Sequence, residues 1–239
     1  MITMNLLQEL LILSEASKEK SLIGLTINGK LITDKTKDEP WPGYFGCNDN
    51  QLTSLEGAPA SVGGNFACSY NKLTSLDGAP ASVGGYFVCS KNKLTSLEGS
   101  PASVGGSFDC WDNQLTSLKG APASVGGGFS CSYNQLTSLE GAPASVCSYF
   151  GCDNNQLTSL EGIHKILKSM NGTFYADNNP LKSHVLGLLL VKGCKKVELD
   201  NKVVEEVLNR YLPNNRGAKA VIEAQSELLD LDLEDWAQL

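Results

Sequence analysis

The sequence is dominated by a tandem repeat of 21 residues, and Pro101–Ala121 is one regular copy of it. Phenylalanine recurs every 21 residues from Phe45 to Phe150, and Phe174 follows after a three-residue insertion. A cysteine, an asparagine and two leucines follow each phenylalanine at fixed offsets in these copies up to Phe150. A fixed period of this length is typical of solenoids, because each short unit buries its apolar face only by stacking on its neighbours. The repeat therefore predicts one continuous body of seven rungs over residues 43–181, where a rung is one copy of the repeat.

Within each rung, only the segment around Phe-x-Cys has the character of a β-strand. Alternation along a strand puts Phe and Cys on one side and the residue between them on the other. Stacked rungs would then form a parallel sheet, and the asparagine would satisfy backbone groups left unpaired in the following turn. The rest of each rung contains Pro and Gly and is too short for a helix, which favours an extended or 3₁₀ outer side.

The segments before and after the repeats are expected to cover the open apolar ends of the solenoid. Residues 1–42 would form an N-terminal cap with a helix over Met4–Ser17, whose leucines share one face. A β-hairpin would follow, turning at Asn28-Gly29, because both positions of a type I′ turn require positive φ. Trp41 lies between two prolines and is expected to anchor this cap on the first rung.

Residues 182–239 are expected to form a helical C-terminal cap. The apolar run His184–Leu190 predicts a helix, and Lys196–Leu199 predicts a last strand. Asp200 is a candidate N-cap for a helix that ends at Tyr211, and a further helix is predicted over Ala218–Leu229.

The formal net charge of −7 argues against non-specific nucleic-acid binding, which depends on Lys and Arg neutralising phosphates. The negative charge does not exclude a protein partner with a basic surface. The first thirteen residues are apolar but contain Glu9 and no basic leader, so they fit neither a secretory signal nor a membrane span. We therefore expect a cytoplasmic protein without a nucleic-acid or membrane partner.

No constellation of residues in the sequence suggests catalysis or metal binding. Six of the eight cysteines occupy one repeated position, which predicts buried free thiols stacked from rung to rung, and no CxxC pair supports a metal site. The two histidines, His164 and His184, give no triad or zinc cluster. Cys194 has basic neighbours that would favour a thiolate, but no base partner accompanies it. We expect no catalytic residue, cofactor or metal. If the protein is an enzyme after all, the alternative is one that acts through Cys194 or His184.

The repeat resembles the short bacterial type of leucine-rich repeat, P-x-x-L-x-x-L-x-V-x-x-N-x-L-x-x-L. It has one extra residue and places Phe and Cys where that family has Leu or Val; in one copy the matching residues are Val104, Phe108, Cys110, Asn113, Leu115 and Leu118. The resemblance covers residues 43–181. It implies an α+β repeat solenoid with a parallel concave sheet, a non-helical convex side and terminal caps. The phrase Leu-Thr-Ser-Leu-Glu-Gly-Ala-Pro and the ending from Val197 also resemble leucine-rich-repeat proteins of bacteriophages, which suggests an origin.

The candidate binding residues are those that the repeat does not keep. The outward strand positions beside Phe and Cys vary from rung to rung and include large aromatic and acidic side chains, as protein interfaces do. The candidates are Tyr44, Tyr86, Val88, Asp109, Trp111, Tyr149, Asp153 and Tyr175. Drift at exposed sites would also produce variation, but it would leave Lys, Glu and Ser more often than Trp and Tyr.

The sequence thus favours a non-enzymatic protein-binding module whose concave face docks a positively charged patch of its partner. The phage resemblance implies that this partner is a bacterial host protein in the host cytoplasm, such as a component of antiviral defence that the protein inhibits. The alternative is a structural role, as a virion component or as a homo-oligomer that assembles through its caps.

Overall fold

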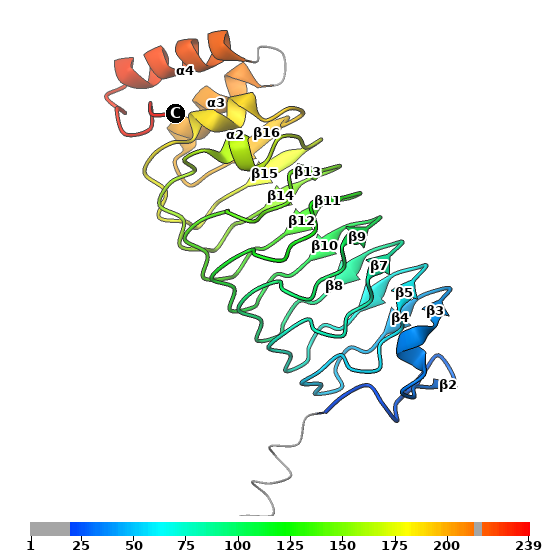
Figure 1. The fold of residues 1–239 in the computed structure, drawn as a ribbon. Coiled ribbons are helices and arrows are strands. Elements are labelled where there is room, and N and C mark those ends of the chain that lie inside the picture. The colour runs from blue at the N-terminus through cyan, green and yellow to red at the C-terminus, as the bar shows by residue number, and fades with distance from the viewer. Residues whose placement is uncertain (1–19, 213–216) are drawn as a thin grey trace, which may run out of the picture.

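The structure is a computed structural model that describes residues 20–212 and 217–239. The helix predicted over Met4–Ser17 lies outside the described residues. The described chain is a solenoid whose rungs stack along one axis, with two parallel sheets along the stack and helices at its C-terminal end (Figure 1). The prediction of a repeat solenoid with a helical C-terminal region is therefore confirmed.

The larger sheet has eight parallel strands, one from each rung and one from the C-terminal segment. Its strands are β4 (Phe45–Gly46), β6 (Phe66–Ala67), β8 (Phe87–Val88), β10 (Phe108–Asp109), β12 (Phe129–Ser130), β14 (Phe150–Gly151), β15 (Thr173–Tyr175) and β16 (Lys196–Glu198). The register is exact across the repeats, so each phenylalanine pairs with the next, and Phe174 pairs with Val197. The strand predicted after the seven rungs is confirmed as β16, the eighth strand of this sheet.

A second sheet of six parallel strands forms on the return side of the rungs. It consists of β3 (Pro40–Trp41), β5 (Ser61–Val62), β7 (Ser82–Val83), β9 (Ser103–Val104), β11 (Ser124–Val125) and β13 (Ser145–Val146). The prediction that only the Phe-x-Cys segment forms a strand was therefore wrong. Two residues are too few to show alternation in the sequence, and these strands are completed by hydrogen bonds from neighbouring rungs.

Phenylalanine and cysteine form two continuous columns inside the solenoid. From Phe45 to Phe174, successive ring centroids are 5.1 to 5.6 Å apart, which is the range that aromatic pairs prefer. The six repeated cysteines are fully buried and none of them is in a disulfide. Burial raises the pKa of Cys47 to about 12, and it raises the pKa of the other repeated thiols as well. The cysteines therefore act as small apolar core residues, as predicted.

The asparagine column connects each rung to the one before it. The Asn113 amide donates hydrogen bonds to the carbonyl oxygens of Cys110 in its own rung (3.1 Å) and Cys89 in the preceding rung (3.2 Å). Its side-chain oxygen accepts from the backbone N–H of Leu94, also in the preceding rung (3.1 Å). The same bonds recur at Asn71, Asn92, Asn134, Asn155 and Asn179. The predicted role of these residues in satisfying the turn backbone is confirmed.

The Gly-Gly pair between the two strands of a rung allows neighbouring rungs to approach closely. A Cβ atom on Gly105 would overlap the carbonyl oxygen of Gly84 in the preceding rung. In the sixth rung Cys147 takes the place of the first glycine; its side chain is exposed, and its N–H donates to the carbonyl oxygen of Gly127 instead of to that of a valine.

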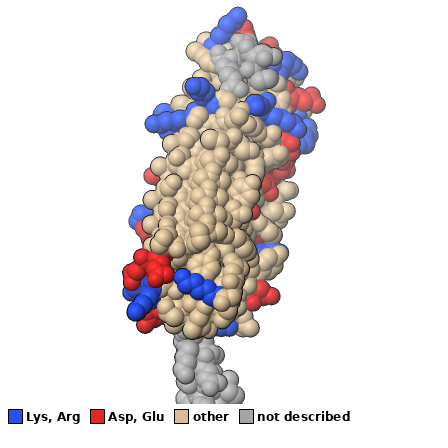
Figure 2. All heavy atoms as spheres, turned by 90° about the vertical axis from the view of Figure 1, so that its right-hand side faces the viewer, with Lys and Arg blue, Asp and Glu red and all other residues tan. Residues whose placement is uncertain are grey.

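Figure 2, which shows the side on the right of Figure 1, has charged side chains mainly near the ends of the stack and an uncharged middle.

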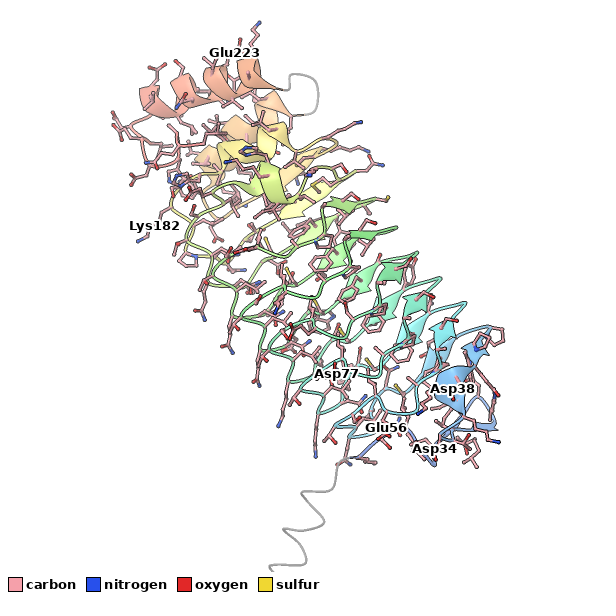
Figure 3. The ribbon with its side chains drawn as sticks, in the orientation of Figure 1. Asp34, Asp38, Glu56, Asp77, Lys182 and Glu223 are labelled. Atoms are coloured by element: carbon pink, nitrogen blue, oxygen red, sulfur yellow. The ribbon has the colours of Figure 1, made fainter. Side chains whose placement is uncertain are left out.

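At the N-terminal end, β1 (Thr26–Ile27) and β2 (Lys30–Leu31) form the predicted antiparallel hairpin. Its turn residues Asn28 and Gly29 have φ values of 50° and 79°, as a type I′ turn requires. A short 3₁₀ helix η1 (Thr36–Asp38) follows, and the buried Trp41 ring packs edge-on against Phe45. The predicted anchoring role of Trp41 is therefore confirmed. Figure 3 shows Asp34 and Asp38 at this end of the stack and Glu223 at the other.

The short helix α2 (Ile163–Ile166) precedes β15 within the last part of the repeats, and the C-terminal segment contains the 3₁₀ helix η2 (Leu186–Leu190), α3 (Lys202–Tyr211) and α4 (Ala218–Asp230). The two predicted helices that end near Tyr211 and Leu229 are confirmed. The N-cap of α3 is Asn201, whose side chain accepts from the Val204 N–H, and the prediction of Asp200 was wrong by one residue. The Asp200 carboxylate instead accepts from the backbone N–H of Asn179. The division of the chain into an N-terminal cap (1–42), seven repeats (43–181) and a C-terminal cap (182–239) stays a prediction.

Candidate functional site

The eight candidate residues belong to the eight-stranded sheet and its immediate ends, at positions that alternate with the buried Phe and Cys. We call this surface the outward face. Tyr44 and Tyr86 are about half exposed, at 48% and 53%, whereas Val88, Asp109 and Trp111 are partly buried by their neighbours. Tyr149, Asp153 and Tyr175 are partly buried as well. All eight residues therefore lie on one sheet or directly beside its strands, but only some of them line a common site.

Four of the candidates meet around a shallow hollow of about 220 Å³ in the middle of the outward face. It is lined by Tyr86, Val88, Ser107, Asp109 and Tyr149. Val88 and Asp109 are register partners on the adjacent strands β8 and β10. Tyr86 and Tyr149 come from rungs three repeats apart, so sequence spacing alone does not predict that they share a site.

Glycine in the intervening rungs lets the two tyrosines converge. A Cβ atom on Gly128 would overlap the Tyr149 ring, so that ring extends over the rung before its own. A Cβ atom on Gly106 would overlap the Tyr86 ring, so that ring extends over the following rung. The two side chains therefore lean toward each other, and Ser107 and Asp109 lie in one of the two rungs between them.

Asp109 is the charged group of the hollow. One carboxylate oxygen, Oδ1, accepts hydrogen bonds from the Ser90 hydroxyl (3.0 Å) and from the Trp111 N–H (3.3 Å). Burial raises the pKa of the Asp109 carboxyl above its usual range, and these two hydrogen bonds oppose that shift. Burial also raises the pKa of the Tyr149 phenol, and the nearby Asp109 carboxyl raises it further.

Within residues 20–212 and 217–239, no ion pair involves Asp109, and its second oxygen Oδ2 has no hydrogen bond. Asp153, on the same face, differs in this respect. Its Oδ1 accepts from the Ser132 hydroxyl, and its Oδ2 accepts from the Asn154 amide at 2.8 Å. Asp109 is therefore a partly desolvated carboxylate with one oxygen available, whereas both oxygens of Asp153 are occupied.

A row of alternating rings and one cation runs beside the hollow, at the edge where the strands enter their turns. The Lys91 ammonium lies 4.8 Å from the centroid of the Tyr70 ring and 4.9 Å from that of Trp111. The Trp111 ring in turn contacts Tyr133 edge-on, with centroids 6.4 Å apart. These contacts link four consecutive rungs, so the row is a continuous part of the surface.

Sequence reasoning found only Trp111 in this row and missed Tyr70, Lys91 and Tyr133. These three residues follow the outward strand positions, and each adopts the left-handed conformation, with φ of 57°, 54° and 55°. Non-glycine residues other than Asn and Asp are uncommon there. The available signal was the presence of Tyr and Lys at a repeated turn position that Asp or Asn occupies in other rungs, such as Asp112 and Asn154.

The remaining candidates lie outside the hollow. The Tyr175 ring contacts the Tyr149 ring edge-on, with centroids 6.3 Å apart. Tyr44 lies at the N-terminal end of the sheet, where its backbone carbonyl accepts hydrogen bonds from Asn28 and Trp41. Tyr175 is therefore an extension of the site, and Tyr44 is separate from it.

A second hollow of about 380 Å³ lies between the turns of the last rungs, α2 and the C-terminal Leu239. It includes His164, whose buried Nδ1 lies next to Gly187 and has no hydrogen-bond partner among the residues that the structure describes. Cys194 is fully buried, and its thiol donates to the Lys196 carbonyl. His184 contacts the Ser183 hydroxyl through Nδ1. Of these three residues, His164 lines this second hollow, whereas Cys194 and His184 are not among the lining residues of either hollow.

In the part of the chain that the structure describes, no three His, Cys, Asp or Glu side chains are grouped as a metal site would require. Within the same residues, no helix combines the length and the apolar character needed to cross a lipid bilayer. The chain matches no protein-family model, and no curated protein has a significantly similar sequence.

Proposed function

We propose that this chain is a leucine-rich-repeat protein of the short bacterial type that binds another protein through its outward face. The observation that carries the proposal is the presence of large aromatic side chains in the middle of that face: Tyr86 and Tyr149 line the hollow, and Trp111 belongs to the row beside it. Tyrosine and tryptophan are enriched among the residues that dominate binding energy at protein interfaces. The row of Tyr70, Lys91 and Tyr133 enlarges this surface.

The rigidity of the scaffold supports the same proposal. The strands below the aromatic residues are joined to both neighbours by backbone hydrogen bonds, such as Phe87 to Ser107 and Phe108 to Gly128, each 2.9 Å. The Asn column adds side-chain bonds between the same rungs. A surface that is already ordered loses little conformational entropy on binding, so more of its contact energy contributes to affinity.

The resemblance to bacteriophage leucine-rich-repeat proteins suggests the identity of the partner. We infer a phage-encoded protein that acts in the host cytoplasm on a bacterial protein, with a component of antiviral defence as the target it would inhibit. The Asp109 carboxylate, whose Oδ2 has no hydrogen bond to the described residues, favours a partner surface with positive charge.

The proposal is tested by capture of a partner from bacterial lysate, followed by binding measurements with the isolated partner. The double variant Tyr86→Ala, Trp111→Ala should weaken binding at least about 30-fold, since hot-spot residues contribute about 1 to 2 kcal/mol or more each. Ile222→Ala is the matched control, because this side chain is 64% exposed and lies on α4, away from the outward face. Equal affinity of the double variant and the native protein would place the binding surface elsewhere.

One observation favours the structural alternative, assembly through the C-terminal cap. The outermost helix α4 and the turn after it expose Ile222, Leu229 and Leu231, at 64%, 47% and 46%. Size-exclusion chromatography with light scattering tests this alternative. A concentration-independent monomer would rule it out, whereas an oligomer that dissociates in the double variant Ile222→Lys, Leu229→Lys would support it.

A further inference from the structure

The hollow on the outward face has the features of a site for one positively charged side chain. Its volume of about 220 Å³ is smaller than the ~300 to 1,000 Å³ of pockets that enclose small-molecule ligands. It is walled by two tyrosine rings and has a carboxylate among its lining residues. The size therefore suits a single amino-acid side chain of a larger partner.

The carboxylate decides the charge of the occupant. An apolar side chain entering the hollow would remove more water from Asp109 without replacing it, and burial of an unpaired charge is costly. A cation would pair with Oδ2, the oxygen that the protein's own hydrogen bonds leave available. The electron-rich faces of Tyr86 and Tyr149 would attract the same cation.

The neighbouring row already uses this chemistry within the protein. Lys91 places its ammonium between the rings of Tyr70 and Trp111, 4.8 and 4.9 Å from their centroids. Trp111 also connects the two places, because its backbone N–H donates to Asp109 Oδ1. The outward face thus holds the Lys91 cation between aromatic rings, next to a second aromatic site whose carboxylate forms no ion pair with the described residues.

The geometry points to a binding site for one lysine or arginine side chain of a protein partner, held between Tyr86 and Tyr149 and paired with Asp109 Oδ2. This inference rests on the proposed function and names the chemistry that the outward face recognises. Glycine at position 128 is a positioning residue for this site, because any side chain there would displace the Tyr149 ring. Ser90 is another, because its hydroxyl orients the carboxylate.

The test uses the full-length protein and three small probes of similar size: the Nα-acetyl amides of lysine, arginine and norleucine. Binding is followed by NMR through the backbone amide signals of Val88, Asp109 and Tyr149. We expect saturable shifts with lysine, arginine or both, and at least about tenfold weaker binding of the neutral norleucine probe. Norleucine binding as strong as that of the charged probes, or no saturable shift with any probe, would overturn the inference.

Two variants and a matched control assign the binding to this hollow. Asp109→Asn should weaken binding of the charged probes at least about tenfold, because it removes the charge while keeping the shape. Tyr149→Ala should weaken it as well, which provides a second test through a different wall of the hollow. Asp153→Asn is the control, since both oxygens of Asp153 are already occupied, and it should bind as the native protein does. Unchanged binding in Asp109→Asn would refute the assignment.

Failure of this inference can be told apart from failure of the proposed function. If the Tyr86→Ala, Trp111→Ala variant loses its protein partner while the charged probes do not bind, the cation site is refuted and the binding module remains. If the probes bind as expected while partner affinity is unchanged in that variant, the cation site is supported and the proposed binding surface is not.

Discussion

Replacement of one asparagine in the middle of the column should destabilise the whole solenoid. Asn113 is almost fully buried, and its side chain bonds to two rungs at once. The variant Asn113→Ala leaves the Leu94 N–H without an acceptor in a fully buried position. The carbonyl oxygens of Cys89 and Cys110 each keep one donor, from Asn92 and Asn134 respectively, and lose the other.

The size of the effect follows from these three groups. A buried N–H without a partner costs about 1 to 3 kcal/mol, and each lost hydrogen bond to a carbonyl that keeps another costs about 0.5 to 1 kcal/mol. The sum is a loss of about 2 to 5 kcal/mol in the free energy of unfolding. Because a typical domain is stable by only about 5 to 15 kcal/mol, such a loss is readily measured.

The measurement is urea-induced unfolding followed by circular dichroism, with Asn50→Ala as the control at the same repeat position in the first rung. The Asn50 amide donates one bond within its own rung, to the Asn48 carbonyl, and Asn50 is only partly buried. Its replacement should cost about 1 kcal/mol or less. If the two variants were destabilised equally, the bonds between rungs would contribute little, and the argument from the asparagine column would fail.

Three further predictions concern the Gly-Gly pairs, the cysteines and the hollow. Gly105→Ala should lower the free energy of unfolding by about 1 to 3 kcal/mol through overpacking. The control Gly43→Ala, at a position with open space around it, should lower it by less than about 0.5 kcal/mol. Similar urea midpoints for the two variants would contradict the overpacking. In the folded protein at about pH 8, a thiol reagent should modify exposed Cys147 rapidly and buried Cys47, with its pKa of about 12, only on unfolding. Mass spectrometry of labelled peptides measures both reactions, and equally rapid labelling of the two cysteines in the folded protein would contradict this prediction. Burial raises the pKa of Asp109 in the folded protein above its value in the unfolded chain. The melting temperature should therefore fall as the pH rises from the pKa of the unfolded chain through the raised pKa of the folded protein. Asp109→Asn should remove that fall.

The strength of the sequence prediction came from repetition. A core residue that recurs every 21 positions, such as Phe108, must stack on its own copies, because a rung is too thin to bury it alone. The same logic predicted the buried thiols and the role of Asn113. It failed for Ser103–Val104, which forms a strand of the second sheet, because a two-residue strand exists only through the hydrogen bonds of its neighbours.

The sequence by itself determined the solenoid, its register and the strand positions whose side chains alternate with the buried Phe and Cys. The tertiary structure alone decided which of them form a site. Tyr86 and Tyr149 meet at Asp109 because their rings lean toward each other across glycines, and Lys91 lies between two rings because its turn adopts a left-handed conformation. Repeat spacing sets which backbones are adjacent, but the direction of a side chain depends on the space that its neighbours leave.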